Sequence, residues 1–527
     1  MTSLCNTIQY NRRTRFLGVV LWLWATAGYS AAPEDIRFQV DQFILVGELP
    51  GEADTINQLL GNAQGKSYSL TSLQALSKRI EYILHDDGYT FYRVILPPQS
   101  LADGVVNFKI IAYNLGAIEI IGNDYFDENN ILRSMPALQK ETPLNTHDLA
   151  ETLKVANHHP AKQIYLTFKQ SETEGKVDAE ISVAEQRPYN ISLIMNNAGT
   201  KDSGYYRITA AVQHNNLWNL DHSFNASYTT SPDHADSVIQ YGFDYNAPIY
   251  PLKGWLSAYY VYSDIDTGIV AGGFNVSGTG EMYGISYQQY LPRIENYEHW
   301  LTAGLDNRFF DNNIQFEFQE IGTDVRSTPF HLGYRAEYPW KSTLFSYNVQ
   351  WLRNVGYGSY NSALDYNLAR LGADNNWDAF RYGFDISSYL GEWLFKLNFN
   401  GQHSPDLLIP GEQIGLGGTY SVRGYQERET SADSGQVLRL EVNTPHWYGI
   451  YLASFFDYGH GRQTATLPEE PSEWNIGSLG FGGRWQWRNY IFVSVDLAFA
   501  LMDAPQTQEQ NTRAGDNRVH ASIILRY

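Results

Sequence analysis

A glycine-rich stretch around Arg423 is the segment whose residue types point most directly to chemistry. Residues 415–427 read GLGGTYSVRGYQE, with glycine at positions 415, 417, 418 and 424. The backbone N–H groups of such a loop, together with an arginine, can hold a phosphate. A phosphate-binding loop leads from a strand into a helix, whereas the VLRLEVN that follows here alternates like a strand. The sequence therefore predicts a structural connection between two strands and no nucleotide site.

Other patterns that carry chemistry are incomplete. GNAQGKS (61–67) has three residues between its glycines, where a phosphate loop needs four. His158 and His159 are adjacent, so they cannot share one helix face as paired metal ligands do. No G-x-S-x-G nucleophile turn occurs. We therefore expect no cofactor, no metal site and no catalytic centre, so the protein is not expected to be an enzyme. Scattered acidic residues acting as general acid and base are the alternative.

The first thirty residues indicate the compartment. Arginines within residues 12–15 precede an apolar run at 16–27, and small residues follow. This pattern predicts a secretory signal peptide over residues 1–30, with a twin-arginine signal as the alternative. The apolar run is too short to span a bilayer. Cleavage removes Cys5, the single cysteine, and leaves residues 31–35 as a short N-terminal segment.

The composition argues against a helical enzyme. The 527 residues include 38 Tyr, 25 Phe, 13 Trp and 44 Gly, which suits short strands with aromatic girdles. The formal net charge is -20, so nucleic acid is not an expected partner. Apart from the signal peptide, no segment approaches the ~18 consecutive apolar residues of a membrane helix.

Helical and extended patterns alternate twice between residues 36 and 187. Residues 36–112 read as strand, helix, helix, strand, strand, and residues 113–187 repeat that order. Each unit of about 75 residues can pack two helices on a three-stranded sheet. Such a sheet has an open edge strand, which can accept an extended peptide. We expect these edges at 91–96 and 164–169, with candidate binding residues Phe91, Arg93, Ile95, Tyr165 and Thr167.

Local signals set two of the helix boundaries. Apolar residues at helical spacing predict a helix over residues 70–85, and Gly88 is a natural left-handed terminator for it. In the second unit, Asn145 is the predicted N-cap of a helix over residues 146–157.

From residue 188 to residue 527 the sequence reads as strand after strand. In residues 490–501 the apolar side chains fall on one face, whereas Ser494 and Asp496 fall on the other. A charge facing inward is costly in a sandwich core but natural in a barrel with lipid outside and water inside. We count sixteen segments of about 10 residues, from 189–199 to 518–527. The sequence therefore predicts an all-β transmembrane barrel; a soluble two-sheet β protein is the alternative.

The glycine-rich stretch falls within a long connection of this barrel, at about residues 405–434. On the second strand after it, alternation from Tyr451 onward points Asp457 into the lumen. An arginine on a loop that folds into the lumen needs a partner for its charge. We therefore expect Arg423 and Asp457 to form a charge-assisted, bidentate contact inside the barrel.

These features together resemble the outer-membrane transporters of two-partner secretion, the TpsB proteins of the haemolysin secretion/activation family (ShlB/FhaC/HecB), which are related to the BamA assembly factors. The resemblance rests on VRGY after the eleventh strand, the two modules and the aromatic last residue, Tyr527. It implies two small α+β POTRA domains, at 36–112 and 113–187, before a barrel of 16 antiparallel strands. It also implies that the sixth extracellular loop folds into the lumen. Its tip motif would be Val422, Arg423, Gly424 and Tyr425, and the lumen motif that meets it would be Phe455, Asp457 and Gly459.

The resemblance also implies a function. Such a transporter captures an unfolded, mostly β-helical exoprotein with its POTRA domains in the periplasm and exports it through the barrel without a nucleotide. It implies a monomer in the outer membrane of a Gram-negative bacterium. Outer-membrane lipid is a further implied partner, as are periplasmic chaperones and the barrel-assembly machinery during biogenesis. A BamA-like assembly factor, a passive porin and a barrel protease or phospholipase are the alternatives. Many family members carry an N-terminal plug helix, for which residues 31–35 are too few, so we expect the sixth loop to do more of the closing.

Overall fold

The computed structural model describes residues 36–527 apart from 52–53, 141, 200–202, 236–237, 265–267, 271–273, 277–279, 312–314, 317–318, 321–322, 467–470 and 506–510. The predicted signal peptide, the segment 31–35 and the question of a plug helix lie outside the described residues. The chain forms two compact units. One consists of residues up to Ile83 together with Arg93–Ile110, and the other of Leu84–Tyr92 together with Ile111–Tyr527.

The first module is a small α+β fold. Its elements are, in chain order, β1 (Arg37–Val40), β2 (Gln42–Val46), α1 (Asp54–Ala63), β3 (Lys66–Ser69), α2 (Leu70–Asp86), β4 (Tyr92–Ile95) and β5 (Val105–Ala112). The predicted chain order of strand, helix, helix, strand, strand is present as β2, α1, α2, β4 and β5. The three strands form one sheet in the order β2-β5-β4. There is one addition, because the first extended run breaks at Asp41 and its leading part, β1, pairs with β3. This pairing joins segments about thirty residues apart, so local alternation does not reveal it.

Helix α2 matches the predicted helix closely. Leu73, Ile80 and Leu84 are buried and follow the spacing of one helical face. The helix ends at Asp86, and Gly88 has φ of +91°, a conformation in which a Cβ is disfavoured.

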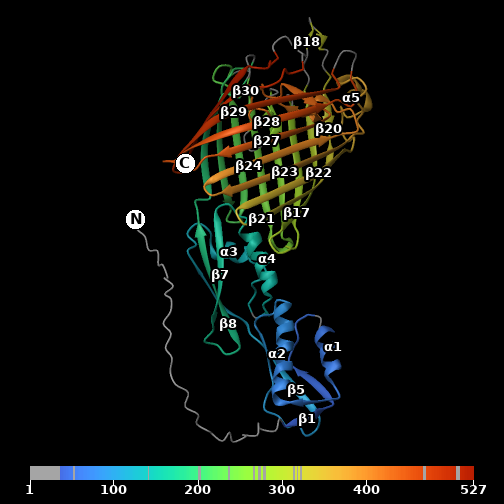
Figure 1. Ribbon diagram of the computed structural model, residues 1–527, viewed down its shortest axis with the longest axis vertical. Coiled ribbons are helices and arrows are strands. Elements are labelled where there is room, and N and C mark those ends of the chain that lie inside the picture. The colour runs from blue at the N-terminus through green and yellow to red at the C-terminus, as the bar shows by residue number, and fades with distance from the viewer. Residues whose placement is uncertain are drawn as a thin grey trace, which may run out of the picture. The chain divides into compact units, whose positions relative to one another are not determined.

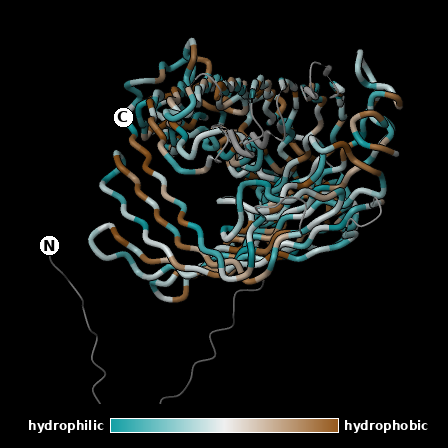
Figure 2. The backbone as a smooth tube through the Cα atoms, turned by 90° about the horizontal axis from the view of Figure 1, so that it is seen from above, coloured by the Kyte–Doolittle hydropathy of each residue, from teal (hydrophilic) through white to brown (hydrophobic). Residues whose placement is uncertain are grey.

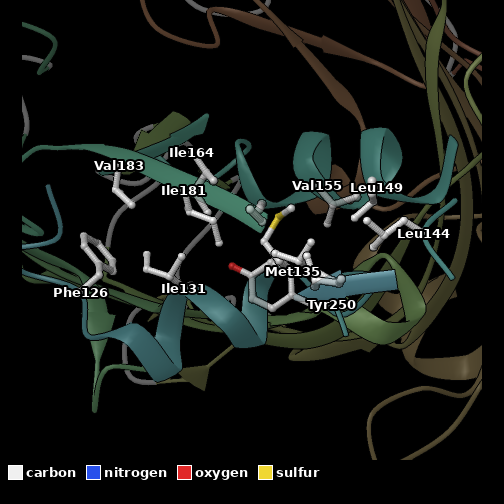
Figure 3. Close-up of a cluster of buried hydrophobic side chains, with 14 of the residues drawn as sticks. Phe126, Ile131, Met135, Leu144, Leu149, Val155, Ile164, Ile181, Val183 and Tyr250 are labelled. Carbon is white, nitrogen blue, oxygen red and sulfur yellow. The ribbon is translucent and has the colours of Figure 1, made fainter. Parts of the chain in front are cut away.

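The second module repeats the order without additions. Its elements are β6 (Asn114–Ile121), α3 (Glu128–Ser134), α4 (Thr146–Ala156), β7 (Lys162–Gln170) and β8 (Lys176–Glu185). The sheet order is β6-β8-β7. The predicted cap is confirmed, since the Asn145 side chain accepts hydrogen bonds from the backbone N–H groups of His147 and Asp148. Figure 3 shows side chains from both helices and the sheet converging on one core, with Tyr250 of the following region among them.

The remaining chain closes into a barrel, whose strands lie side by side in Figure 1. Its elements are β9 (Tyr189–Asn196), β10 (Arg207–Leu217), β11 (His222–Thr230), β12 (Gln240–Ile249), β13 (Gly254–Ser263), β16 (Gly280–Tyr290), β17 (Glu298–Phe310), β20 (Val325–Ser327), β21 (Pro329–Trp340), β22 (Thr343–Asn354), β23 (Asp378–Leu390), β24 (Trp393–His403), β27 (Ser434–Asn443), β28 (Ile450–Arg462), β29 (Glu473–Trp487), β30 (Ile491–Ala500) and β31 (Asn517–Arg526). β20 and β21 both pair with β17 and are separated only by Thr328, so they form one barrel strand. β31 pairs with β9, which completes the predicted closed barrel of 16 strands.

Alternation along the strands gives the barrel its two surfaces. In β30, Val495 is exposed on the outside and Asp496 is buried toward the lumen. Figure 2 shows the same alternation of hydrophobic and hydrophilic residues along several strands. An apolar exterior with a polar interior suits a barrel surrounded by lipid.

The connections carry short elements that the sequence did not predict. Helix α5 (Ala363–Ala369) follows β22, and the segment between β24 and β27 contains η2 (Pro410–Glu412), β25 (Ile414–Leu416) and β26 (Thr430–Ala432). The other short elements are η1 (Tyr250–Leu252), β14 (Gly268–Val270), β15 (Phe274–Val276), β18 (Gln315–Phe316) and β19 (Gln319–Glu320). No helix in the described part of the chain has the length and apolar character needed to cross a membrane.

Candidate functional site

Residues 404–433, here called loop six, connect β24 to β27 and fold against the inner wall of the barrel. The paired strands β25 and β26 carry a tip made of residues 417–429. Gly417 and Gly418 have φ of +108° and +98°, which other residues adopt only with strain. A Cβ on Gly418 would lie 2.0 Å from an oxygen of Glu427. These glycines therefore allow a tight turn, which is the structural role expected from the sequence.

Arg423 is fully buried and contacts Asp457 of β28 with two parallel hydrogen bonds. Its Nε donates to Oδ2 at 2.7 Å and its Nη2 donates to Oδ1 at 2.9 Å. The backbone N–H of Arg423 also donates to Oδ2, at 3.2 Å. The guanidinium carbon lies 3.4 Å from the centre of the Phe455 ring, a cation–π contact. The structure thus brings together the loop arginine and two of the three lumen residues named from the sequence.

Further charged residues surround this pair. Arg423 donates to Glu441 of β27 at 3.0 Å and lies 3.6 Å from Asp496 of β30. Arg439 of β27 donates to the backbone carbonyl of Tyr420, so the wall also holds the loop backbone. A buried charge is stable only when partners compensate its lost hydration. The cluster provides this balance with the acids Asp457, Glu441 and Asp496 and the arginines Arg423, Arg439 and Arg484.

The other motif residues fit the wall by shape. Val422 lies against Gly459, where an added Cβ would come within 3.0 Å of the valine Cγ2. A Cβ on Gly424 would lie 2.7 Å from the Ser478 Cβ, which explains the glycine at that position. The hydroxyl of Tyr425 donates to the Met502 carbonyl at 2.7 Å. Each residue of the tetrapeptide therefore has its own contact with the barrel.

His520 of the last strand holds the tip from another side, a contact that the sequence did not single out. Its Nε2 lies 2.6 Å from the carbonyl oxygen of Arg423, and its Nδ1 lies 3.0 Å from the Thr419 hydroxyl. Nothing local in the sequence indicated that a loop about a hundred residues earlier would meet His520.

The candidate phosphate and metal patterns have structural roles. GNAQGKS begins inside α1 and ends in β3, which is the reverse of the strand-to-helix setting that a phosphate loop requires. The His158 ring packs against Trp255 and Trp300. The described residues contain no group of three or more His, Cys, Asp or Glu side chains placed to hold a metal.

The second module joins the barrel through a buried polar network. Lys162 of β7 donates from Nζ to Asp221, in the turn between β10 and β11, at 2.6 Å. It also donates to the Asn130 side chain, and the hydroxyl of Tyr250 donates to Asp221 at 2.5 Å. Burial lowers the pKa of Lys162, and the Asp221 carboxylate opposes that shift. The network connects the second α+β module to the barrel, two parts of the chain that were predicted from the sequence as separate domains.

A cavity of about 410 Å³ lies at this joint. Asn215, Trp255 and Trp300 line it together with His158 and His159. His159 is held by two partners, since its Nε2 lies 2.6 Å from the Asn215 carbonyl and the Ala161 N–H donates to its Nδ1. Burial lowers the pKa of His159. The two adjacent histidines thus belong to a packed joint.

Both predicted edge strands lie at the edges of their sheets. β4 ends the sheet β2-β5-β4, and β7 ends the sheet β6-β8-β7. Ile95 and Tyr165 are exposed on these strands, as is Thr167. Phe91, in contrast, precedes β4 and packs its ring 4.7 Å from that of Phe168. Arg93 is exposed and pairs with Glu81 at 2.7 Å.

The outward backbone of β7 is partly capped by its own module. Asn157 accepts from the Ile164 N–H at 2.6 Å and donates to the Ile164 carbonyl at 2.9 Å. Backbone groups of an antiparallel edge strand point outward at every second residue. The next outward positions are therefore Leu166 and Phe168, so an added strand would pair along this part of β7.

Comparison with known proteins places the chain in a family. A family model described as haemolysin secretion/activation protein ShlB/FhaC/HecB matches residues 175–483, more than half of the chain. The chain belongs to this family. A second model, POTRA domain of ShlB type, matches residues 38–112. The protein is therefore an outer-membrane β-barrel transporter of two-partner secretion.

Individual relatives agree over most of their length. The heme/hemopexin transporter protein HuxB of Haemophilus influenzae (strain 86-028NP) is 20% identical over 450 residues, which covers 81% of this chain and 77% of the relative. The outer membrane transporter CdiB of Escherichia coli O6:K15:H31 is 22% identical, covering 79% and 70%. The solved structure of CdiB from Escherichia coli superposes with a TM-score of 0.71 at 18% identity, covering 95% of this chain and 93% of that one. This likeness shows the fold.

Proposed function

We propose that this transporter receives one large exoprotein in an unfolded, extended form, aligns it along its edge strands and passes it through the lumen while loop six moves. The observation that carries the proposal is the seating of Arg423, which fixes the loop inside the barrel by reversible polar contacts with Asp457. Hydrogen bonds of this kind can be exchanged for bonds to water or to a passing chain. A loop held by apolar burial alone would lack that property.

The domain division that we propose follows the sequence. A signal peptide covers residues 1–30 and a short segment covers 31–35. Two POTRA domains then cover 36–112 and 113–187, and the barrel covers 188–527. The transporter works as a monomer in lipid, after chaperones and the barrel-assembly machinery have inserted it. Neither a nucleotide nor a metal takes part.

The exposed edge of β7 is the proposed docking line for cargo in the second POTRA domain. Strand addition uses the outward N–H and C=O groups at Leu166 and Phe168 and leaves cargo side chains to alternate along the edge. Tyr165, exposed by 53%, stands beside this line. In the first POTRA domain, the exposed Ile95 on the edge strand β4 corresponds to Tyr165 on β7.

The test begins with a large secreted β-helical protein encoded beside this gene, co-expressed with the transporter and assayed in the medium. Export that depends on the transporter supports the proposal; retention of the partner in the periplasm contradicts it. Docking is tested by placing a photo-crosslinking amino acid at Tyr165. The matched control is Tyr82, equally aromatic and 68% exposed, on helix α2. We expect cargo to crosslink at Tyr165 and not at Tyr82; equal crosslinking at both positions would contradict edge-strand docking.

A further inference from the structure

The part of loop six that precedes the tip has a second, separate anchor. Glu412 is buried at the end of η2, and its Oε2 accepts from Arg308 Nη1 of β17 at 2.7 Å. The same oxygen lies 3.5 Å from Arg381 Nη2 of β23. These two strands differ from β27, β28 and β30, which hold Arg423. Loop six is therefore attached at two distinct parts of the barrel wall.

Apolar packing supports the same anchor. Leu408 and Ile409 are fully buried in a cluster that includes Phe310 and Trp377. Gly411 lies so close to the Phe310 ring that an added Cβ would come within 2.3 Å of it. Residues 408–412 are thus fixed by close packing as well as by the ion pair.

The other end of the loop is tied to the same place. Asp433 is fully buried, pairs with Arg370 and accepts from the Leu408 N–H at 3.0 Å. The Gln402 side chain donates to the backbone carbonyls of both Glu412 and Asp433, at 3.0 and 3.2 Å. One side chain thus bridges the two ends of the hairpin that carries the tip. Residues 413–432 run from this closed base to the tip and back as the β25–β26 hairpin, which the wall also contacts through hydrogen bonds such as that from Trp474 to Thr430.

The number of residues between the base of loop six and its tip determines which of the two can move further. Asp433 directly precedes β27, so the base is held within one residue of the wall. Arg423 is ten residues or more from either end of the base. A rotation about the base therefore moves the tip far and the base little.

We propose that Glu412 is a positioning residue for gating: with Gln402 and Asp433 it fixes the base of loop six as a pivot, and the tip at Arg423 is the end that leaves the wall. The inference deepens the proposed transport function and rests on it. Without the Glu412 carboxylate, the positive charges of Arg308 and Arg381 repel each other with less negative charge between them. The base of loop six is then held less firmly against the wall. The tip is then seated less accurately, and the channel opens without cargo.

The test uses the purified full chain in planar lipid bilayers, where channel opening is recorded without cargo. Glu412→Gln keeps size and an acceptor oxygen but removes the charge. We expect its open-time fraction to rise about tenfold, the effect expected for one lost charge-assisted hydrogen bond. Glu412→Asp keeps the negative charge between Arg308 and Arg381, so its open-time fraction should stay closer to the original value than that of Glu412→Gln. The matched control is Glu473→Gln, an exposed acid paired with Arg462 on the same barrel, which should change nothing.

A disulfide tests the moving end. Val422→Cys with Gly459→Cys places two sulfur atoms where the valine methyl now meets the glycine, in a background with Cys5 replaced by Ser. We expect the oxidised pair to hold the channel closed and to stop export, and reductant to restore both. An open-time fraction for Glu412→Gln within twofold of the original would overturn the pivot, as would full export through the oxidised pair.

The experiments distinguish a failure of the pivot at Glu412 from a failure of the proposed export function. The recordings need no cargo, so a positive result stands even when the neighbouring protein is not exported. Heat-dependent gel mobility confirms that each variant is a folded barrel. Should Glu412→Gln not fold, the disulfide still decides the question.

Discussion

Lys162 and Asp221 form an ion pair of 2.6 Å between the second α+β module and the barrel, and both side chains are almost fully buried. Asn130 hydrogen-bonds to both charged groups, and the Tyr250 hydroxyl donates to Asp221. Figure 3 shows Tyr250, from a turn of the barrel, among the core side chains of that module. The second module and the barrel therefore share one core, and a swing of this module would have to expose a buried pair of charges.

Lys162→Met tests this joint. The substitution keeps the length of the side chain but leaves Asp221 buried without its cation, which costs roughly 3–5 kcal/mol. We expect faster hydrogen exchange in β7 and α3 while the barrel strands remain protected. Lys169→Met, on the exposed face of the same strand where Lys169 pairs with Glu180, is the control and should have no such effect. Unchanged exchange in Lys162→Met would show that apolar packing alone holds the joint.

The Arg423–Asp457 contact is testable by exchange of charges. Arg423→Ala should abolish or strongly impair export while the barrel still inserts, since the buried carboxylate loses a partner worth roughly 3–5 kcal/mol. Arg423→Asp combined with Asp457→Arg should recover part of the export that either single change loses. Secretion into the medium is the measurement, with heat-modifiable gel mobility as the control for insertion. Export of Arg423→Ala at the native rate would contradict the role of the anchor.

Gly424→Ala tests the fit of the tip against the wall. The added Cβ would lie 2.7 Å from the Ser478 Cβ and 3.1 Å from the Ala500 backbone, so the tip must shift. Overpacking of this kind costs about 1–3 kcal/mol. We expect reduced export and a channel that opens more often. Gly61→Ala in α1, which has nothing within 4 Å of its added Cβ, is the control and should export normally.

Much of the fold follows from the sequence because alternation and helical spacing are local. Strand alternation placed Asp457 and Asp496 toward the lumen, and the Asn145 cap was visible in the sequence itself. With Arg423 on a loop that needed a partner, the same alternation was enough to suggest the contact with Asp457. Its consequence for export is a separate matter, for which the charge exchange is the test.

The ion pairs that join segments distant in the sequence could not be predicted from local alternation or helical spacing. Lys162 is 59 residues from Asp221, and Arg308 is 104 residues from Glu412. Neither pair lies in a motif, and each residue alone reads as an ordinary surface or lumen charge. Short elements such as α5 and β25 were missed for a related reason, since tertiary contacts rather than periodicity stabilise them.

His159 makes the joint sensitive to acid. Its two ring nitrogens are both engaged in a neutral tautomer, in which Nε2–H donates to the Asn215 carbonyl and Nδ1 accepts from the Ala161 N–H. A second proton on the ring would sit on Nδ1, where this new N–H would point at the N–H of Ala161 and the hydrogen bond between them would be lost. Burial lowers the pKa of His159 from 6.5, and the attraction of Asp221, 3.8 Å away, opposes this without reversing it.

The sign of the pH effect follows from that direction. The folded protein binds a proton at His159 less readily than the unfolded chain, so stability is lost as the pH falls from about 6.5 toward the folded pKa. We expect the unfolding midpoint of the purified protein to drop between pH 7.5 and pH 5.5 (about two units, spanning the histidine range), and His159→Gln to reduce that drop. His147→Gln is the matched control, because His147 is exposed on α4 of the same domain. If His159→Gln and His147→Gln show the same loss at low pH, other groups control the acid sensitivity, and the neutral tautomer of His159 has no part in it.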